Sequence, residues 1–208
     1  MNTKESTLRL WDWTLVKTIM ALSLLLFAAL FLFGGYTEES TRQAIRWTAR
    51  ISTVLFSFAF AASALHHLLQ NSFSFWLRQN RKYIGISFAF IHMIHLLFLG
   101  LLQASFHPVF DMAKTSSLIG GGMAYGFLVL MLLTSFPTFS RKLSPKNWKR
   151  LHTVGGYWIW FIFFKSYWKR ALTEPEHIPI VLLLAGVLLV RLWYLWKKNP
   201  AIQLSESS

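Results

Sequence analysis

Five of the seven histidines in this chain lie within apolar stretches long enough to cross a membrane. They are His66, His67, His92, His95 and His152. A single helical histidine is usually a structural polar group, but ionisable residues within a membrane are costly and normally face a bundle interior or a polar site. Neutral imidazole is also the commonest metal ligand in proteins. Five such residues on three stretches therefore indicate a ligand site.

Helix rise gives each histidine a depth. With the basic pair that opens the third stretch at the inner face, His95 lies about 20 Å and His92 about 15 Å above that face. Three others lie about 6–8 Å from it: His66, His67 and His152. Imidazoles at one level on facing helices suit the axial coordination of haem iron. Zinc is disfavoured because its ligands would not converge at one height, and a proton relay normally uses intramembrane carboxylates.

The composition predicts the elements that hold these histidines. Of 208 residues, 54% are hydrophobic and only 14% are charged, and there is no cysteine, which excludes disulfides, thiolate metal sites and iron–sulfur clusters. Apolar runs of about 20 residues are long enough to cross a membrane. They predict an all-α, six-helix membrane bundle that forms a single domain. Its spans are expected at residues 14–33, 44–70, 81–103, 118–136, 148–168 and 178–196. The net charge of +13 then reflects membrane topology, and no nucleic-acid partner is expected.

Basic residues favour one orientation of this bundle. With the N-terminus in the cytoplasm, the inner segments hold Lys4, Arg9, Arg78, Arg81, Lys82, Arg141, Lys142, Lys146, Lys149, Arg150, Lys197 and Lys198. The outer segments hold Arg42, Arg46, Lys114, Lys169 and Arg170. The excess of Lys and Arg on one side predicts that both termini are cytoplasmic. The basic segment before the fifth span is either a consequence of this topology or a docking site for an acidic partner or anionic headgroups.

Several short motifs resemble one membrane family. The spacing of Arg81, Gly85 and His95 is similar to the third helix of bacterial ferric-reductase-like membrane proteins. The group that it most resembles is the haem-binding membrane subunit of the periplasmic methionine-sulfoxide reductase system. "TAR" at Thr48–Arg50 and "LTSFPTFSRKLSPKNWKRLH" at Leu133–His152 resemble further motifs of that group. The resemblance implies that His95 and His152 are haem ligands.

Lys165 departs from the family pattern. The family has a second fifth-helix histidine 13 residues after the one that His152 matches, and here that position is Lys165. The ammonium group can extend to the outer interface, pair with a haem propionate or serve as an unusual axial amine. A further alternative is that the outer haem is absent. His66 or His67 can compensate for the missing histidine by binding a haem iron together with His152. His92 either donates a hydrogen bond beside His95 or replaces His95 as the ligand.

The resemblance implies a b-type haem protein, with one or two haems, that carries electrons across the inner membrane. The expected donor is a cytoplasmic flavin reductase or quinol, with FMN or quinone as a further cofactor, and the acceptor is extracytoplasmic. The chain would then be an electron-transfer subunit with a soluble or membrane redox partner. The alternative is a haem-free relative that handles metal, transports a solute or assists assembly. A proton-coupled transporter is less favoured, since no inverted repeat is visible.

Overall fold

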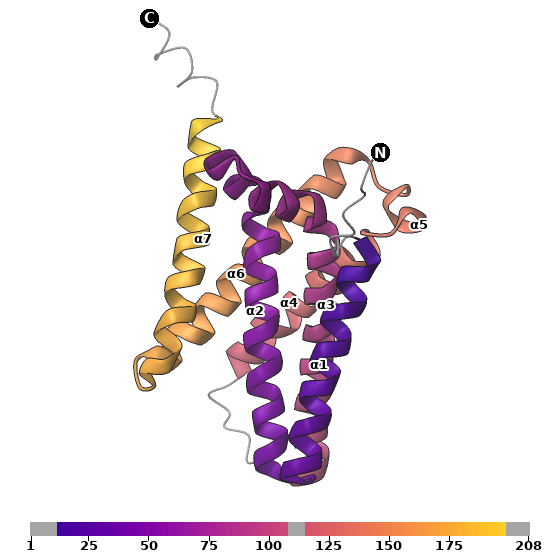
Figure 1. The fold of residues 1–208 in the computed structure, drawn as a ribbon, viewed down its shortest axis with the longest axis vertical. Coiled ribbons are helices and arrows are strands. Elements are labelled where there is room, and N and C mark those ends of the chain that lie inside the picture. Colours follow the sequence, from indigo (N-terminus) through magenta and orange to yellow (C-terminus); the bar gives the residue numbers. More distant parts are fainter. Residues whose placement is uncertain (1–11, 108–114, 199–208) are drawn as a thin grey trace, which may run out of the picture.

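The computed structural model describes residues 12–107 and 115–198, which form helices and the turns between them (Figure 1). The elements are α1 (Asp12–Gly34), α2 (Glu38–Leu69), α3 (Ser72–Phe106), α4 (Thr115–Leu133), α5 (Pro137–Ser140), α6 (Pro145–Ala171), the 3₁₀ turn η2 (Pro175–His177) and α7 (Ile178–Lys197). The predicted all-α class is confirmed for these residues. Three of the basic residues used to predict orientation lie outside the described ranges: Lys4, Arg9 and Lys114.

Two tight turns join the first three helices into antiparallel neighbours. Between α1 and α2, Gly35 adopts a left-handed φ of 67°, and the Thr37 side chain accepts a hydrogen bond from the backbone N–H of Ser40. Between α2 and α3, Gln70 is left-handed and Asn71 forms a capping box with Ser74. Side-chain oxygens here satisfy backbone donors that a helix start leaves free. Each helix therefore ends and the next begins within three residues.

Helix α2 is the central element of the bundle. It packs along α3 on one side and α7 on the other, while α6 runs obliquely behind it and packs against α4 and α7 (Figure 1). Its buried residues are mostly small or hydroxyl-bearing: Ser40, Thr41, Ala44, Thr48, Ser52, Thr53, Ser57, Ala61, Ala62 and Ala64. Small residues let helix backbones approach closely in a membrane, and hydroxyls such as that of Ser57 donate to a carbonyl one turn earlier. This surface explains the close packing of α2 and α3.

Within residues 12–107 and 115–198, four helical segments are long and apolar enough to cross a membrane, so the chain has the character of a membrane protein. They are Asp12–Gly34, Glu38–Leu69, Ser72–Phe106 and Pro175–Lys197. The apolar part of α4, Ile119–Leu133, is shorter. Helix α6 is long but carries basic residues at both ends, and only 14 residues separate Arg150 from Lys165. By helix length and hydropathy, four of the six predicted spans thus qualify among the described residues.

Helices α2 and α3 extend beyond the predicted spans. They contain 32 and 35 residues, so α3 is roughly 52 Å long against a hydrocarbon core of about 30 Å. The extension of α2, residues 38–43, is polar, whereas that at the beginning of α3, residues 72–80, mixes polar residues with Phe73, Phe75, Trp76 and Leu77; both start at the caps described above. One consequence is that Arg81 lies nine residues inside α3, rather than at its beginning.

Candidate functional site

Two groups of polar side chains lie at opposite ends of the bundle. We name each end after the turn that lies there, the α1–α2 turn or the α2–α3 turn. The α1–α2 end also holds the last turns of α3 and α6 and the start of α7. The α2–α3 end holds the start of α6 and the last turns of α7. His92 and His95 lie in the second half of α3, towards the α1–α2 end. His152 lies near the beginning of α6, at the α2–α3 end.

At the α1–α2 end, a cavity of about 280 Å³ lies between α2, α3, α4 and α6. We call it the His92 cavity. Its lining includes the imidazoles of His92, His95 and His177, the rings of Tyr125, Phe163 and Tyr167, and the guanidinium-bearing residues Arg46, Arg50 and Arg170. Imidazole donors, aromatic walls and cationic side chains thus meet in one site.

Hydrogen bonds fix the tautomers of His92 and His95. Nδ1 of His95 donates to the carbonyl oxygen of Ile45 at 3.1 Å, since a carbonyl can only accept. Nδ1 of His92 lies 3.0 Å from Ser52 Oγ, and that hydroxyl already donates to the Ala49 carbonyl. Ser52 therefore accepts from His92. In both rings Nδ1 carries the hydrogen, which leaves the Nε2 lone pair available to a metal.

Neighbouring rings enclose the imidazole of His92. It stacks on His95 at a centroid distance of 5.1 Å and on Tyr125 at 5.0 Å. Phe163 meets it edge-on at 5.1 Å, and the Tyr125 hydroxyl donates to the His92 carbonyl. These contacts fix the orientation of His92 and, through it, one face of His95.

His177 is the cavity residue that sequence reasoning missed. It ends η2 directly before α7 and is only 4% exposed. Its Nδ1 lies 3.4 Å from the Glu174 carbonyl and 3.3 Å from the Glu174 carboxylate, so Nδ1 carries a hydrogen here too. In the sequence, His177 lies between a proline turn and an apolar run, one residue outside the span expected at residues 178–196.

Tyr167 gives the His92 cavity an unsatisfied polar atom. Its hydroxyl is buried and lies near Thr53 without a well-formed hydrogen bond to any described residue. The Tyr167 ring lies 5.8 Å from the His177 ring. A buried hydroxyl without a partner is costly, so a bound polar group in this cavity would stabilise it.

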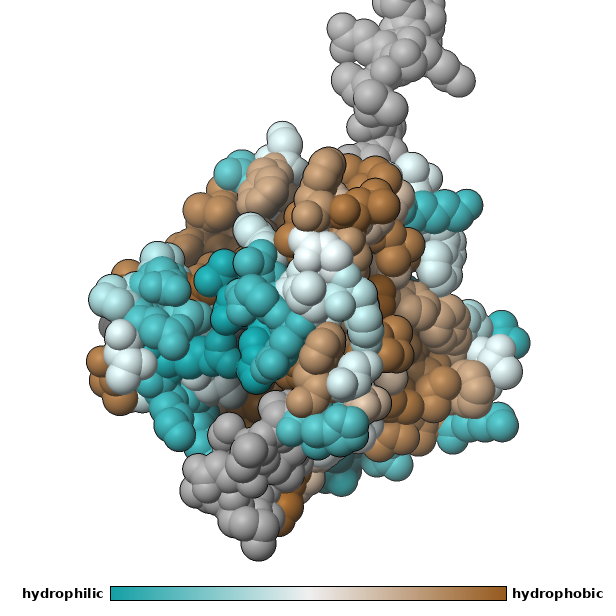
Figure 2. Space-filling model, turned by 90° about the horizontal axis from the view of Figure 1, so that it is seen from below, coloured by the Kyte–Doolittle hydropathy of each residue, from teal (hydrophilic) through white to brown (hydrophobic). Residues whose placement is uncertain are grey.

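A larger basic vestibule opens beside the His92 cavity. It has a volume of about 1320 Å³ and shares Arg46, Arg50, Arg170 and His177 with that cavity. Lys165 and Lys169 also line it. Figure 2, which views the molecule from this end, shows hydrophilic side chains gathered on part of the face, with apolar side chains around them.

The cations of the vestibule differ in their partners. Arg42 pairs with Glu38, and Arg46 pairs with Glu39. Among the described residues, no carboxylate pairs with Arg50, Arg170 or Lys165. Lys165 is exposed and lines the vestibule, not the His92 cavity. Its place in the structure agrees with a side chain extended to the outer interface, or with one that meets an anionic group in the vestibule.

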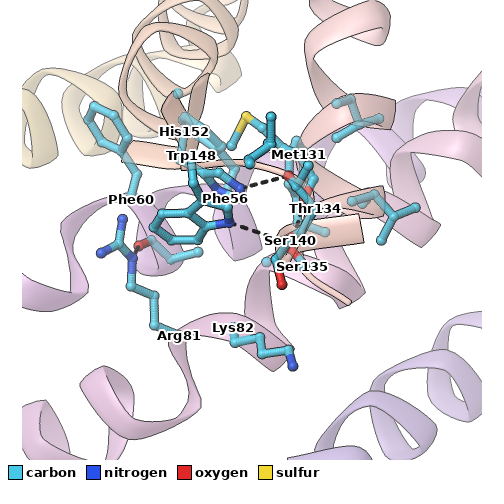
Figure 3. A pocket seen from close by; sticks show the side chains of 18 of the residues that line it. Phe56, Phe60, Arg81, Lys82, Met131, Thr134, Ser135, Ser140, Trp148 and His152 are labelled. Carbon is cyan, nitrogen blue, oxygen red and sulfur yellow. Dashed lines mark hydrogen bonds between the residues drawn. The ribbon is translucent and has the colours of Figure 1, made fainter. Parts of the chain in front are cut away.

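At the α2–α3 end, a cavity of about 580 Å³ surrounds His152. We call it the His152 cavity. Figure 3 shows Arg81 and Lys82 on one side of it and Thr134, Ser135 and Ser140 on the other, with the Trp148 ring between them. Phe56, Phe60 and Met131 contribute apolar walls.

The imidazole of His152 is held by Thr134 and Trp148. Its Nε2 lies 3.0 Å from Thr134 Oγ1, and that hydroxyl donates to the Leu130 carbonyl, so Nε2 is the donor. Trp148 Nε1 donates to the Thr134 carbonyl, and its ring stacks on His152 at 4.1 Å (Figure 3). His152 is therefore the opposite tautomer from His92 and His95, with only Nδ1 free to bind a metal.

Two arginines line the His152 cavity without a carboxylate partner among the described residues. Arg191 donates to the Phe60 carbonyl at 2.6 Å and to the Tyr157 hydroxyl, and it lies 4.2 Å from the centroid of the Phe60 ring. Arg81 donates to the Ala59 carbonyl at 3.0 Å. Both guanidinium groups thus donate hydrogen bonds to carbonyl groups of neighbouring α2 residues. Because carbonyls do not neutralise their charge, this side of the cavity is positively charged.

The structure places His66 and His67 away from His152. His66 Nδ1 lies 3.2 Å from Ser74 Oγ at the beginning of α3. His67 is exposed and lies beside the rings of Trp193 and Tyr194 on α7. Neither residue lines the His152 cavity. Their pairing with His152 stays a prediction, for which the described residues offer no shared cavity.

Three phenylalanines separate the two cavities. Phe56 and Phe88 line the His152 cavity, whereas Phe163 lines the His92 cavity. The Phe163 ring lies 5.5 Å from Phe56 and 6.1 Å from Phe88, and Phe88 lies 5.7 Å from the His92 ring. We call these three residues the phenylalanine septum. It forms a continuous chain of aromatic contacts from one cavity to the other.

Comparison with known proteins finds no matching family model and no matching curated protein. The resemblance to ferric-reductase-like membrane proteins therefore rests on the short motifs given above.

Proposed function

We propose that this protein is a b-type haem membrane protein that carries electrons across the inner (plasma) membrane. The electrons pass from a cytoplasmic flavin reductase or quinol to an extracytoplasmic acceptor. The six-span topology with both termini in the cytoplasm belongs to the same proposal. It places the His152 cavity near the cytoplasm and the His92 cavity near the outside.

The observation that carries the proposal is the anchored pair of imidazoles in the His92 cavity. His92 and His95 both hold the Nδ1 hydrogen on a protein acceptor, which is the arrangement that orients a histidine to bind metal through Nε2. The aromatic lining suits the face of a porphyrin, and unpaired guanidinium groups suit its carboxylates. The buried, unsatisfied hydroxyl of Tyr167 is a further sign that a ligand is needed here. The residues present thus fit haem, whose bound iron would supply one-electron chemistry.

The His152 cavity fits the entry of electrons from the cytoplasmic side. It is larger and mainly apolar, and its basic residues Arg81, Lys82 and Arg191 are available to an anionic partner group. A quinol or a flavin such as FMN combines an aromatic body with polar or anionic groups, so either would suit this lining. An inner haem would have to bind through Nδ1 of His152, or displace Thr134 from Nε2.

Absorption spectroscopy of the purified protein tests the proposal. Protein purified from haem-replete cells is expected to show a b-type spectrum that sharpens on reduction with dithionite, because the chain has no cysteine for covalent attachment. Colourless, folded protein from such cells would contradict the proposal.

A haem-free metal-handling protein is the second candidate, and one observation favours it. The ligand atoms of Glu174, Glu176 and His177 all lie within 4.8 Å of one another. Carboxylates with an imidazole form a donor set for a divalent cation. Metal analysis of the same purified sample separates the candidates: this one requires a stoichiometric cation in protein that lacks haem.

A further inference from the structure

His177 brings a third imidazole to the lining of the His92 cavity, besides those of His92 and His95. Helix α3 supplies His95, while η2 brings His177 to the same cavity from a segment more than 80 residues later in the chain. The side chain is buried beside Tyr167. Its Nδ1 hydrogen is directed to Glu174. As with His95, this leaves the Nε2 lone pair free of any hydrogen bond to a described residue.

Lys165, unlike His177, does not line the His92 cavity. The residues of α6 that line the His92 cavity are Ile162, Phe163, Ser166, Tyr167 and Arg170, which share one face because steps of three or four positions connect them. Lys165 is not among them and lines the vestibule instead; it lies about 100° around the helix from Ser166 and about 160° from Phe163. The residue at the family's second fifth-helix position therefore points away from the site that it would be expected to complete.

We propose that His177 is the second axial imidazole of the haem that His95 holds in the His92 cavity. This inference rests on the proposed function and names the residue that replaces the missing fifth-helix histidine. Glu174 acts as a positioning residue, because its carbonyl and carboxylate fix the Nδ1 hydrogen of His177. Arg50 and Arg170, which have no carboxylate partner in the described part of the chain, bind the propionates.

The test is the spin state of the ferric haem in His177→Ala. Two axial imidazoles give a low-spin iron, whereas loss of one gives a high-spin spectrum. We expect His177→Ala to show a high-spin signal or at least a twofold loss of haem from this site, and added imidazole to restore the low-spin spectrum. Imidazole rescue separates a lost ligand from a misfolded protein. His107→Asn is the matched control, since His107 is an exposed histidine at the left-handed end of α3.

Glu176→Gln distinguishes axial ligation from a cation site. If His177 binds iron, Glu176→Gln keeps the wild-type spectrum, because Glu176 makes no hydrogen bond to His177 among those described. Equal loss in His177→Ala and Glu176→Gln, restored by added zinc, would assign His177 to a carboxylate cation site and overturn the inference. A haem-loaded protein whose low-spin signal survives His177→Ala would overturn it while leaving the proposed function in place. Folded wild type without haem would overturn both.

Discussion

The imidazole rings of His92 and His95 lie parallel, with centroids 5.1 Å apart and planes within 8° of each other. Each is fixed to α2 through Nδ1, His92 by Ser52 and His95 by the Ile45 carbonyl. The two residues therefore form a unit in which one ring supports the other. They differ because Tyr125 covers the second face of His92.

This difference predicts unequal effects of substitution. His95→Ala should remove the haem of the His92 cavity, since it deletes the ligand. His92→Ala should retain haem but bind it more weakly, by about 10–100-fold, the usual effect of losing a residue that orients a metal ligand. Haem titration of the two apoproteins measures this. Complete loss in His92→Ala with retention in His95→Ala would reverse the assignment.

Thr134 provides a test of His152 as an iron ligand. Valine has nearly the same shape as threonine, so Thr134→Val removes only the hydroxyl that accepts a hydrogen bond from His152 Nε2. If His152 binds an inner haem through Nε2, the substitution should increase haem per protein. Ser135→Ala is the control, because the Ser135 hydroxyl donates to the Met131 carbonyl instead. Unchanged haem in Thr134→Val would contradict ligation by His152 Nε2.

Replacement of Lys165 tests its role in the vestibule. Lys165→Met should leave the haem content unchanged if the ammonium group only extends to the interface. We expect the same of Lys165→His, because this position does not line the His92 cavity. Haem per protein is the measurement for both variants. A rise in Lys165→His would show that the outer site lacks a ligand in the wild type, contrary to the role proposed for His177.

Close packing of α4 on α6 predicts a stability difference between two glycines. A Cβ added at Gly155 would lie 2.6 Å from the Met131 sulfur and 3.2 Å from Phe127, whereas one at Gly126 would meet nothing within 4 Å. Gly155→Ala should therefore destabilise the protein by roughly 1–3 kcal/mol, as overpacking of a core does. Thermal unfolding in detergent compares it with Gly126→Ala, the control. Equal melting temperatures would show that α4 does not pack on α6 as described.

The proposed topology is open to cysteine labelling, since the chain has no cysteine of its own. Thr173 and Thr138 are exposed positions at opposite ends of α6, Thr173 just beyond its last turn and Thr138 on α5 before it. An impermeant maleimide should label Thr173→Cys in intact cells but label Thr138→Cys only after cell rupture. Labelling of both variants in intact cells would contradict a membrane-crossing α6.

The sequence could predict the helices better than the site. Apolar runs were sufficient to place the first three helices, whereas the polar residues within 38–43 and 72–80 concealed the true lengths of α2 and α3. Depth along a helix was a usable guide, but rotation about it was not. Helix rise puts His66 and His67 at the level of His152, yet their rings lie against Ser74 of α3 and against Trp193 and Tyr194 of α7. His177 escaped notice because only the folding of η2 under α6 buries it.

The phenylalanine septum also places a layer without proton-carrying groups between the two cavities. Its rings offer no donor or acceptor that would carry a proton or an ion between the cavities, so an electron crossing from Phe88 towards His92 would move charge without a compensating ion. In the proposed topology the cytoplasm is the negative side, so an electron that moves outward goes from negative to positive potential, which supplies about 2.3 kcal/mol per 100 mV for a full crossing. The membrane voltage would then favour outward transfer, and its collapse by an ionophore would slow that transfer even with donor and acceptor unchanged.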